Sequence, residues 1–175
     1  MRTDTGIDYY IGLMSGTSLD GVDGVLASFD AKGFPTLTCT ATTGMPKTLR
    51  DELQALNTPT DNEIHRSALA ANVIADLYAG VVNQLLQQAN LTATEIVAIG
   101  AHGQTVRHQP ELGYTIQLLA PARLAELTGI SVIADLRSRD IAAGGQGAPL
   151  VPAFHRAIFG TETPRIVLNL GGIAN

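Results

Sequence analysis

Apolar residues form three short runs near the start of the chain. The runs are Tyr9–Met14, Val22–Phe29 and Thr36–Thr43, and the third is rich in β-branched residues. Ser15–Ser18 separates the first two runs, and a turn at Lys32-Gly33 separates the last two. Runs of this length predict strands, and their short glycine-containing connections predict an antiparallel meander.

The apolar period then lengthens from two residues to three or four. Pro46–Leu56 predicts a short helix, in which Pro46 is tolerated in the first turn. A longer helix is predicted from about Asp61, its N-cap, to Gln88. One face of this helix carries Ile64, Ala68, Ala71, Ala75, Tyr78, Val82 and Leu85. We interpret it as a packing helix, about 42 Å long and able to cross a whole sheet.

Helical and strand patterns alternate in the rest of the chain. Strands are predicted over Ile96–Gly100, Tyr114–Leu118, Ser131–Ala134 and Arg165–Leu170. Helices are predicted over Pro121–Thr128, which Gly129 closes, and over Val151–Phe159. A meander followed by this alternation predicts an α/β fold, with a mixed sheet covered by helices on both faces.

The first and last predicted strands are alike. Tyr10–Ser18 and Ile166–Asn175 are both apolar strands that break into a small turn containing glycine. If a lobe begins at each, residues 1–160 form an amino-terminal lobe and residues 161–175 begin a second one. A chain that ends on an unpaired strand leaves an open sheet edge, which native domains avoid. We therefore expect the second lobe to be truncated.

Composition and charge exclude several classes of function. The 175 residues are 45% apolar and 15% charged, with a formal net charge of −5 and no run of Lys or Arg. A nucleic-acid or anionic-membrane partner is not expected, because both require a basic surface. One cysteine, Cys39, excludes an internal disulfide and a cysteine-based zinc site. No signal-peptide pattern and no uninterrupted apolar stretch of about 18 residues occurs, so we expect a soluble cytoplasmic protein.

The strongest local signal for chemistry is the segment Gly12–Asp23. Its glycines allow backbone N–H groups to approach an anion closely, and its hydroxyl groups add donors. Asp20 and Asp23 supply the hard oxygens that a phosphate-bound Mg²⁺ requires, through water. An ordinary hairpin turn would have a similar composition for conformational reasons. A Walker A loop is excluded, because the Gly-Lys-Ser/Thr ending is missing.

A second cluster, Gly100–His108, directly follows a predicted strand. Ligands gather at the carboxyl ends of strands in open α/β sheets, so this is a natural place for contacts. His102 and His108 have no evident third partner for a metal site. We therefore favour His102 as a hydrogen-bonding loop residue.

A third cluster, Asp135–Asp140, also follows a predicted strand. Arg137 or Arg139 could bind a carboxylate or phosphate in a bidentate manner, or could pair with an aspartate that orders the loop. The next segment, Gly144–Pro149, resembles a dinucleotide-binding loop only loosely, because it lacks the last glycine and a strand immediately before it. We interpret this segment as a flexible connection to the helix that follows.

Five segments, in this order, resemble the anhydro-N-acetylmuramic acid kinases of bacteria. They are Gly12–Asp23, Ala101–Val106, Asp135–Ala142, Gly144–Pro152 and Asn169–Asn175. The resemblance implies an actin-like (ribonuclease H-like) lobe, with a mixed five-stranded sheet flanked by helices, plus the first strand of a second lobe. It also implies a sugar kinase of peptidoglycan recycling that uses ATP and Mg²⁺. Such an enzyme opens the 1,6-anhydro ring with water and phosphorylates O6, giving N-acetylmuramic acid 6-phosphate.

The resemblance assigns site residues as well. ATP and phosphate contacts fall on Gly16, Thr17, Ser18, Leu19, Asp20, Gly21, Val22 and Asp23, with Asp20 contacting Mg²⁺ through water. Sugar contacts fall on His102, Gln104, Thr105, Arg137 and Asp140, where the lactyl carboxylate of the sugar gives an arginine a purpose. The catalytic base of the family, an aspartate in an Asp-Thr-Gly-Pro-Gly-Asn stretch, falls beyond Asn175, so no residue here takes that role.

Members of the resembled family are about twice as long, so we expect this chain to be an incomplete, inactive fragment. The expected ligands are the sugar and ATP. The sequence leaves open whether the protein forms a homodimer. Two alternatives also stay open. One is an actin-like kinase or phosphatase for another small molecule, and the other is a non-catalytic ATP-binding half-protein that pairs with a second polypeptide.

Overall fold

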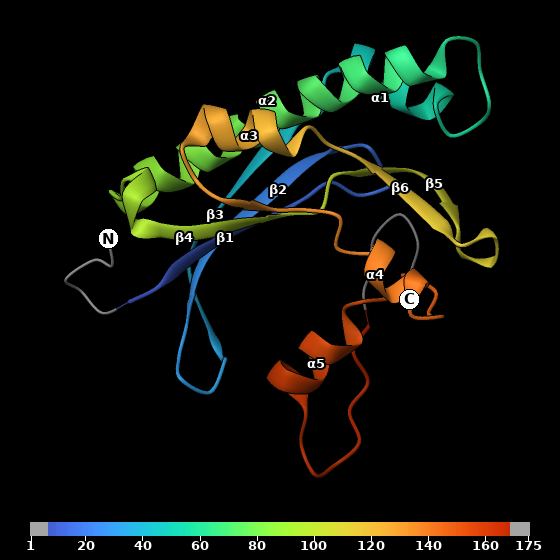
Figure 1. Ribbon diagram of the computed structural model, residues 1–175. Coiled ribbons are helices and arrows are strands. Elements are labelled where there is room, and N and C mark those ends of the chain that lie inside the picture. The colour runs from blue at the N-terminus through green and yellow to red at the C-terminus, as the bar shows by residue number, and fades with distance from the viewer. Residues whose placement is uncertain (1–6, 169–175) are drawn as a thin grey trace.

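A computed structural model describes residues 7–168, and its centre is a five-stranded mixed sheet (Figure 1). The strands are β1 (Tyr9–Met14), β2 (Gly21–Phe29), β3 (Pro35–Gly44), β4 (Ile96–Ala101) and β7 (Val132–Ile133). Their order across the sheet is β3-β2-β1-β4-β7. The first three strands pair antiparallel, while β4 lies parallel to β1 and β7 lies parallel to β4. The predicted meander and the predicted mixed five-stranded sheet are therefore confirmed.

Three helices cover one face of this sheet: α1 (Lys47–Ala55), α2 (Glu63–Ala89) and α3 (Pro121–Thr128) (Figure 1). Helix α2 runs along the sheet and packs against β2, β3, β6 and α3. Its buried residues are Ala70, Ala71, Ile74, Ala75, Tyr78, Ala79, Val81, Val82 and Leu85. They join Ile11, Leu26 and Ile99 from the strands in one core. By length and composition alone α2 could cross a membrane, but this buried face is typical of a core helix.

The amino-terminal end of α2 differs from the prediction in two ways. Ile64 and Ala68, which the periodic pattern assigned to the packed face, are exposed, because the first turns of α2 pack beside α1. The N-cap is Asn62, in a left-handed conformation with φ of 55°, and not Asp61. Glu63, the first residue of the helix, places a negative charge at its positive end.

A separate two-stranded sheet follows β4. It consists of β5 (Gln104–Gln109) and β6 (Tyr114–Leu118), joined by the 3₁₀ turn η2 (Pro110–Leu112). The sequence predicted β6 but assigned β5 to a loop, because its polar residues hide the strand pattern. Another 3₁₀ turn, η1 (Ala93–Glu95), leads into β4.

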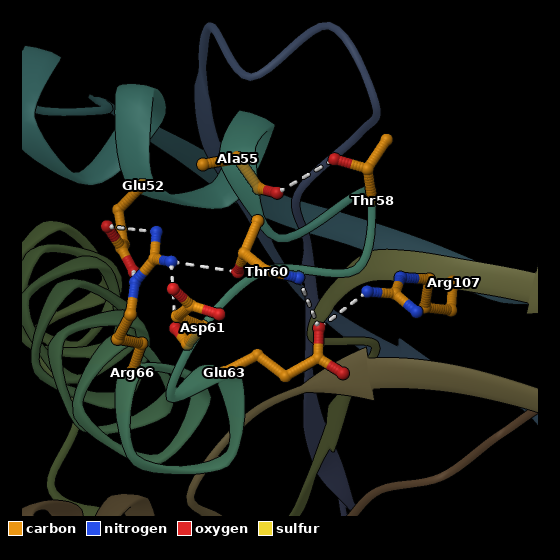
Figure 2. Close-up of polar contacts among 8 residues, drawn as sticks. All are labelled: Glu52, Ala55, Thr58, Thr60, Asp61, Glu63, Arg66 and Arg107. Carbon is orange, nitrogen blue, oxygen red and sulfur yellow. Dashed lines mark hydrogen bonds and ion pairs between the residues drawn. The ribbon is translucent and has the colours of Figure 1, made fainter.

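Charged contacts anchor the β5–β6 hairpin to the helices (Figure 2). The guanidinium of Arg107, on β5, donates from Nη2 to Glu63 Oε2 at 2.7 Å and from Nε to the Leu56 carbonyl at 3.1 Å. Arg66 makes a two-pronged contact with Glu52 at 2.6 and 3.0 Å, which joins α2 to α1. The hairpin is therefore fixed relative to the helical layer.

The opposite face of the sheet is not covered as predicted. Helix α5 (Pro152–Phe159) lies on that side in Figure 1, but none of its residues is buried. Met14, Val25 and Phe29 therefore stay at least 40% exposed. A short helix that the sequence did not predict, α4 (Ser138–Ala142), follows β7.

The end of the described chain also departs from the predicted strand over 165–170. Residues 165–168 have no regular structure and pair with neither described sheet. Residues 169–175, which include the last glycine-bearing turn of the sequence analysis, lie outside the described residues. The division into lobes over 1–160 and 161–175 stays a prediction.

Candidate functional site

Three loops meet at one edge of the main sheet. They follow the carboxyl ends of β1, β4 and β7, which are neighbouring parallel strands. The backbone N–H of His102, just past β4, donates to the Leu13 carbonyl at the end of β1, at 3.0 Å. Ligands of open α/β sheets bind at such an edge. The three clusters that the sequence singled out are thus brought together.

The loop after β1 is a tight turn over residues 16–19. The N–H of Leu19 donates to the Gly16 carbonyl at 3.1 Å, and Leu19 adopts a positive φ of 56° while its side chain is buried. Thr17 and Ser18 are exposed, so their hydroxyls and backbone N–H groups face solvent-accessible space. Non-glycine residues with positive φ are uncommon and occur often at functional sites. This turn is the part of Gly12–Asp23 that could receive a phosphate.

Asp20 ends this turn with an exposed carboxylate. The Ser18 hydroxyl donates to Asp20 Oδ1 at 2.8 Å, and this bond is the main reason that the pKa of Asp20 lies below its ordinary value. The carboxylate is therefore ionised at neutral pH and fits a role beside a metal-bound phosphate.

Ser15, at the start of the same loop, is held by hydrogen bonds in the core. Its hydroxyl is buried, donates to the Gly103 carbonyl at 3.2 Å and receives the Tyr78 hydroxyl proton at 3.1 Å. Burial is the main reason that the pKa of Tyr78 is raised, so this phenol keeps its proton. Ser15 therefore ties β1 to β4 and α2, and its hydroxyl is not available to a phosphate.

The remaining residues predicted to contact phosphate lie in β2. Val22 is fully buried, and Gly21 is buried and paired with Gly44. The Asp23 carboxylate is exposed, but it accepts a hydrogen bond from Thr42 Oγ1 at 2.8 Å on the neighbouring strand. The residues beyond Asp20 therefore belong to the sheet, and the exposed side chains of the turn are those of Thr17, Ser18 and Asp20.

His102 and Arg137 are in direct contact. The Arg137 guanidinium donates from Nε to His102 Nε2 at 2.8 Å and from Nη1 to the Gly147 carbonyl at 2.6 Å. Since Nε2 accepts, the ring proton of neutral His102 sits on Nδ1, which donates to the Gly103 carbonyl at 2.6 Å. Both ring nitrogens are thus engaged, which rules out the metal pair of His102 with His108.

Burial and the neighbouring cation both keep His102 neutral. Burial is the larger cause of the lowered pKa of His102, and the positive charge of Arg137 adds to it. Burial also lowers the pKa of Arg137 from its ordinary value. Among the described residues 7–168, Arg137 pairs with His102 and the Gly147 carbonyl and not with an aspartate, so the predicted Arg–Asp pairing is wrong for Arg137.

Asp140 closes the loop that follows α4. Its Oδ2 accepts the Gly147 N–H at 2.7 Å. A Cβ on Gly145 would collide with this carboxylate, so a larger residue there would require the Asp140 side chain to move. Asp140 therefore shapes the 144–147 segment, which curls back to Arg137 and is not a dinucleotide-binding loop.

Gln104 and Thr105 begin β5. Gln104 is 1% exposed, and its Nε2 donates to the Thr105 carbonyl at 3.3 Å. Its side chain is therefore buried in the protein and is not on the surface of the site. Thr105 is half-buried, and its hydroxyl accepts from Gln117 Nε2 at 3.2 Å. Of the five residues predicted to contact sugar, His102 is the one that lines the cavity described next.

A cavity of about 290 Å³ opens beside His102. Its walls are the β6 strand, the start of α3, and the loop from β7 into α4; its polar members are His102, Thr115, Gln117, Asp135 and Ser138. Small-ligand sites are commonly about this size or larger, with a few polar groups on apolar walls. Hollows of about 370 Å³ lie between α1 and α2 and beside α5, but they touch none of the three loops. No sequence pattern pointed to Thr115 or Gln117 as site residues.

Metal-binding groups are sparse around the site. Within residues 7–168 no three His, Cys, Asp or Glu side chains gather in a way that could hold an ion. Mg²⁺ is usually held by one or two carboxylates together with phosphates and waters. Asp20 therefore fits a Mg²⁺ that arrives with a nucleotide, and not a resident metal.

Comparison with known proteins assigns the family. Residues 8–175 match the family of anhydro-N-acetylmuramic acid kinases. The chain belongs to this family. Curated anhydro-N-acetylmuramic acid kinases from Bordetella petrii and Variovorax paradoxus are 62% and 61% identical to it, over 99% and 96% of this chain and 46% of each relative. A third, from Burkholderia pseudomallei, is 59% identical over 95% of this chain and 43% of its own length. The chain thus spans about half the length of these relatives.

Solved structures add little. RuvC from Thermus thermophilus aligns over 90% of this chain and 84% of its own, with 13% identity and a TM-score of 0.38. An exopolyphosphatase-like protein aligns over 77% and 34%, with 12% identity and a TM-score of 0.35. Both TM-scores are low, and we draw nothing from either likeness.

Proposed function

We propose that the protein is an ATP-dependent kinase that acts in the cytoplasm on 1,6-anhydro-N-acetylmuramic acid. Water adds to C1 and breaks the 1,6-anhydro bond, and the γ-phosphoryl group of ATP passes to O6. The products are N-acetylmuramic acid 6-phosphate and ADP. One observation carries the proposal beyond family membership: the exposed turn Gly16–Asp20 and a sugar-sized cavity beside His102 lie at neighbouring strand ends.

In this proposal the turn Gly16–Asp20 holds the phosphates. Its exposed N–H groups and the Thr17 hydroxyl supply donors, as phosphate-binding loops require, while the Ser18 hydroxyl holds Asp20. Asp20 contacts Mg²⁺ through water, and the bound ion would neutralise charge on the transferring group. Phosphoryl transfer depends mostly on positioning and charge stabilisation, so a turn held rigid by Ser15 suits the reaction.

The second part of the proposal is the sugar site. His102 lines the cavity as a neutral group, while Arg137 orients its ring and leaves Nη2 for the lactyl carboxylate. Thr105 accepts from Gln117, which lines the cavity, and Gln104 donates to the Thr105 carbonyl beside it. Asp140 holds Gly147, whose carbonyl receives Arg137. The hydrogen bond from Arg137 to His102 makes both residues parts of one unit.

The proposal is tested with the native gene product, at whatever length the gene encodes. Incubation with ATP, Mg²⁺, the anhydro-sugar and ¹⁸O-water should release ADP and place one ¹⁸O at C1 of the phosphorylated product. Glucose should give no ADP above background. ADP release with glucose and none with the anhydro-sugar would instead support the alternative of a kinase for another small molecule.

Asp20→Asn provides the matched residue test, with Asp30→Asn as control. Asp30 lies in the turn between β2 and β3, where its Oδ1 accepts from Lys32 and Phe34, a role that asparagine retains. We expect D20N to lower kcat by about tenfold or more and D30N to change it little. Equal rates for D20N and wild type would remove Asp20 from the phosphate site.

Residues 1–175 alone are expected to bind nucleotide weakly and to turn over negligibly. Phosphoryl transfer in a two-lobed kinase needs both sides of a cleft around the phosphates. The check is ADP release by the purified 175-residue chain beside that of the native gene product. Robust release by the chain alone would contradict this expectation.

A further inference from the structure

Hydrogen bonds on the β5–β6 hairpin fix the side-chain amide of Gln117. Its Nε2 donates to Thr115 Oγ1 at 2.7 Å and to Thr105 Oγ1 at 3.2 Å. The Thr115 hydroxyl uses its own proton on the Arg107 carbonyl, at 3.3 Å. Both hydrogens of the amide nitrogen are therefore engaged, and the amide has one preferred orientation.

The oxygen of the same amide has no partner. Gln117 Oε1 is buried and accepts no hydrogen bond within the described residues 7–168. Buried acceptors in folded proteins are nearly always paired, because an unpaired one loses its hydrogen bonds to water and forms no new bond that offsets the desolvation cost. Gln117 also lines the 290 Å³ cavity beside His102. Gln117, whose amide carries this unpaired acceptor, thus lines the candidate sugar site.

We propose that Gln117 binds the sugar, with Oε1 accepting a hydrogen bond from a hydroxyl or acetamido N–H group of the ligand. This inference rests on the proposed function and adds a residue to its site. Sugars carry such donors around their ring, while the neighbouring walls at Leu119 and Pro121 are apolar and offer none. Gln104 Oε1 is unpaired as well, but Gln104 does not line this cavity, so the same role does not extend to it.

Two substitutions separate a ligand contact from a support of the hairpin. Gln117→Met keeps the length of the side chain but removes both the acceptor and the two donors. Gln117→Glu keeps an acceptor oxygen and removes the donors to Thr105 and Thr115. A contact through Oε1 predicts that Q117M is the more damaging change for sugar binding, whereas a supporting role predicts equal damage from both.

The measurement is calorimetric titration of the native gene product with anhydro-N-acetylmuramic acid. We expect Q117M to weaken the affinity by about tenfold, which corresponds to one hydrogen bond, and Q117E to weaken it by clearly less. Titration with ATP should give the wild-type affinity in both variants. Unchanged sugar affinity in Q117M, or equal losses in Q117M and Q117E, would overturn the role of Gln117.

A second readout avoids the variants and covers the case in which Q117M fails to fold. The Gln117 side-chain amide of the wild type, assigned in a ¹H–¹⁵N spectrum, should shift when the anhydro-sugar is added and not when ATP is added. A resonance that stays in place while the sugar binds would overturn the inference and leave the proposed function intact. A wild type that neither binds nor phosphorylates the anhydro-sugar would overturn the proposed function, and this inference with it.

Discussion

Arg137 and His102 form a donor–acceptor pair across two loops, with 2.8 Å between Nε and Nε2. The pair joins the segment after β7 to the turn after β4, and a second bond from Arg137 to the Gly147 carbonyl at 2.6 Å brings in the loop after α4. A single guanidinium thus fixes three segments of the candidate sugar site. Its planar arrangement of donors suits this task, because the two acceptors lie in different directions from the side chain.

Arg137→Lys should therefore weaken sugar binding, although it keeps the positive charge. A lysine ammonium lacks the planar fork and cannot reproduce both bonds with the same geometry. We expect the dissociation constant for the anhydro-sugar to rise by about tenfold, the cost of one or two lost hydrogen bonds. Calorimetric titration measures it, with the neighbouring exposed Arg139→Lys as the matched control. Equal affinities in R137K and R139K would contradict this role.

The neutral state of His102 should make stability depend on pH. The folded-state pKa of His102 lies below its ordinary value of 6.5, mainly through burial. The unfolded chain therefore binds the proton more readily, so the free energy of unfolding falls as pH drops through the window between 6.5 and the lower folded-state value. Above the unfolded pKa the full stability is present. Urea unfolding at several pH values between about 5 and 8 measures the effect.

His102→Gln isolates the contribution of this residue. A glutamine can accept from Arg137 and donate to the Gly103 carbonyl, but it does not titrate. We expect the wild type to lose more stability than H102Q on acidification from neutral pH. His155→Gln, in a helix without buried residues, should keep the wild-type pH dependence. Parallel curves for wild type and H102Q would rule out the proposed proton linkage.

Ser15 and Tyr78 should be coupled energetically. Their hydroxyls lie 3.1 Å apart in the core, where the tyrosine donates and the serine passes its own proton to Gly103. Ser15→Ala leaves the buried Tyr78 hydroxyl unpaired and should cost about 1–3 kcal/mol of unfolding free energy. Tyr78→Phe removes the tyrosine hydroxyl together with its bond to Ser15, so no buried hydroxyl donor is left unpaired. This variant should therefore lose less unfolding free energy than Ser15→Ala. Urea unfolding of both single variants and the double variant should give a coupling energy of about 0.5–1.5 kcal/mol, and strict additivity would contradict the bond.

The sequence predicted most of the fold because its elements have strong local patterns. The three strands of the meander, α3 with its closing Gly129, and the long α2 follow directly from apolar periodicity. The β5 strand does not, because Gln104, Arg107 and His108 interrupt the alternation, and the ion-pair partner of Arg107 is Glu63 on the distant helix α2. The exposed face of the sheet was also missed, since a helical pattern at Pro152–Phe159 indicates a helix but not where it packs.

The candidate site was also predicted only in part, because local patterns locate its loops but not the contacts between them. Polar segments just past predicted strands pointed to residues 16–20, 102 and 137, and the structure joins them at one edge of the sheet. Gly21 and Val22 were included because the family resemblance covers the whole segment Gly16–Asp23, and the sheet buries them. Gln117 gave no signal, because its role depends on which hydroxyls lie across the hairpin, and a single sequence does not contain that information.

Gly103 offers the sharpest test of the geometry beneath the site. It adopts a φ of +75°, and a Cβ there would lie 2.8 Å from the Leu118 carbonyl oxygen. Gly103→Ala should therefore combine backbone strain with a collision, and should displace the carbonyl that receives both Ser15 and His102. We expect a loss of about 2–4 kcal/mol in unfolding free energy, measured by urea unfolding.

Gly113→Ala is the matched control, since Gly113 has a similar φ of +81° but no atom within 4 Å of an added Cβ. It should show the strain alone, about 1–2 kcal/mol. The difference between the two variants then reports the collision and the loss of the shared acceptor. The G103A variant should also weaken sugar binding, because His102 loses the partner that fixes its proton on Nδ1. Equal losses of stability in both variants, with unchanged sugar affinity, would show that the Gly103 carbonyl does not organise the site.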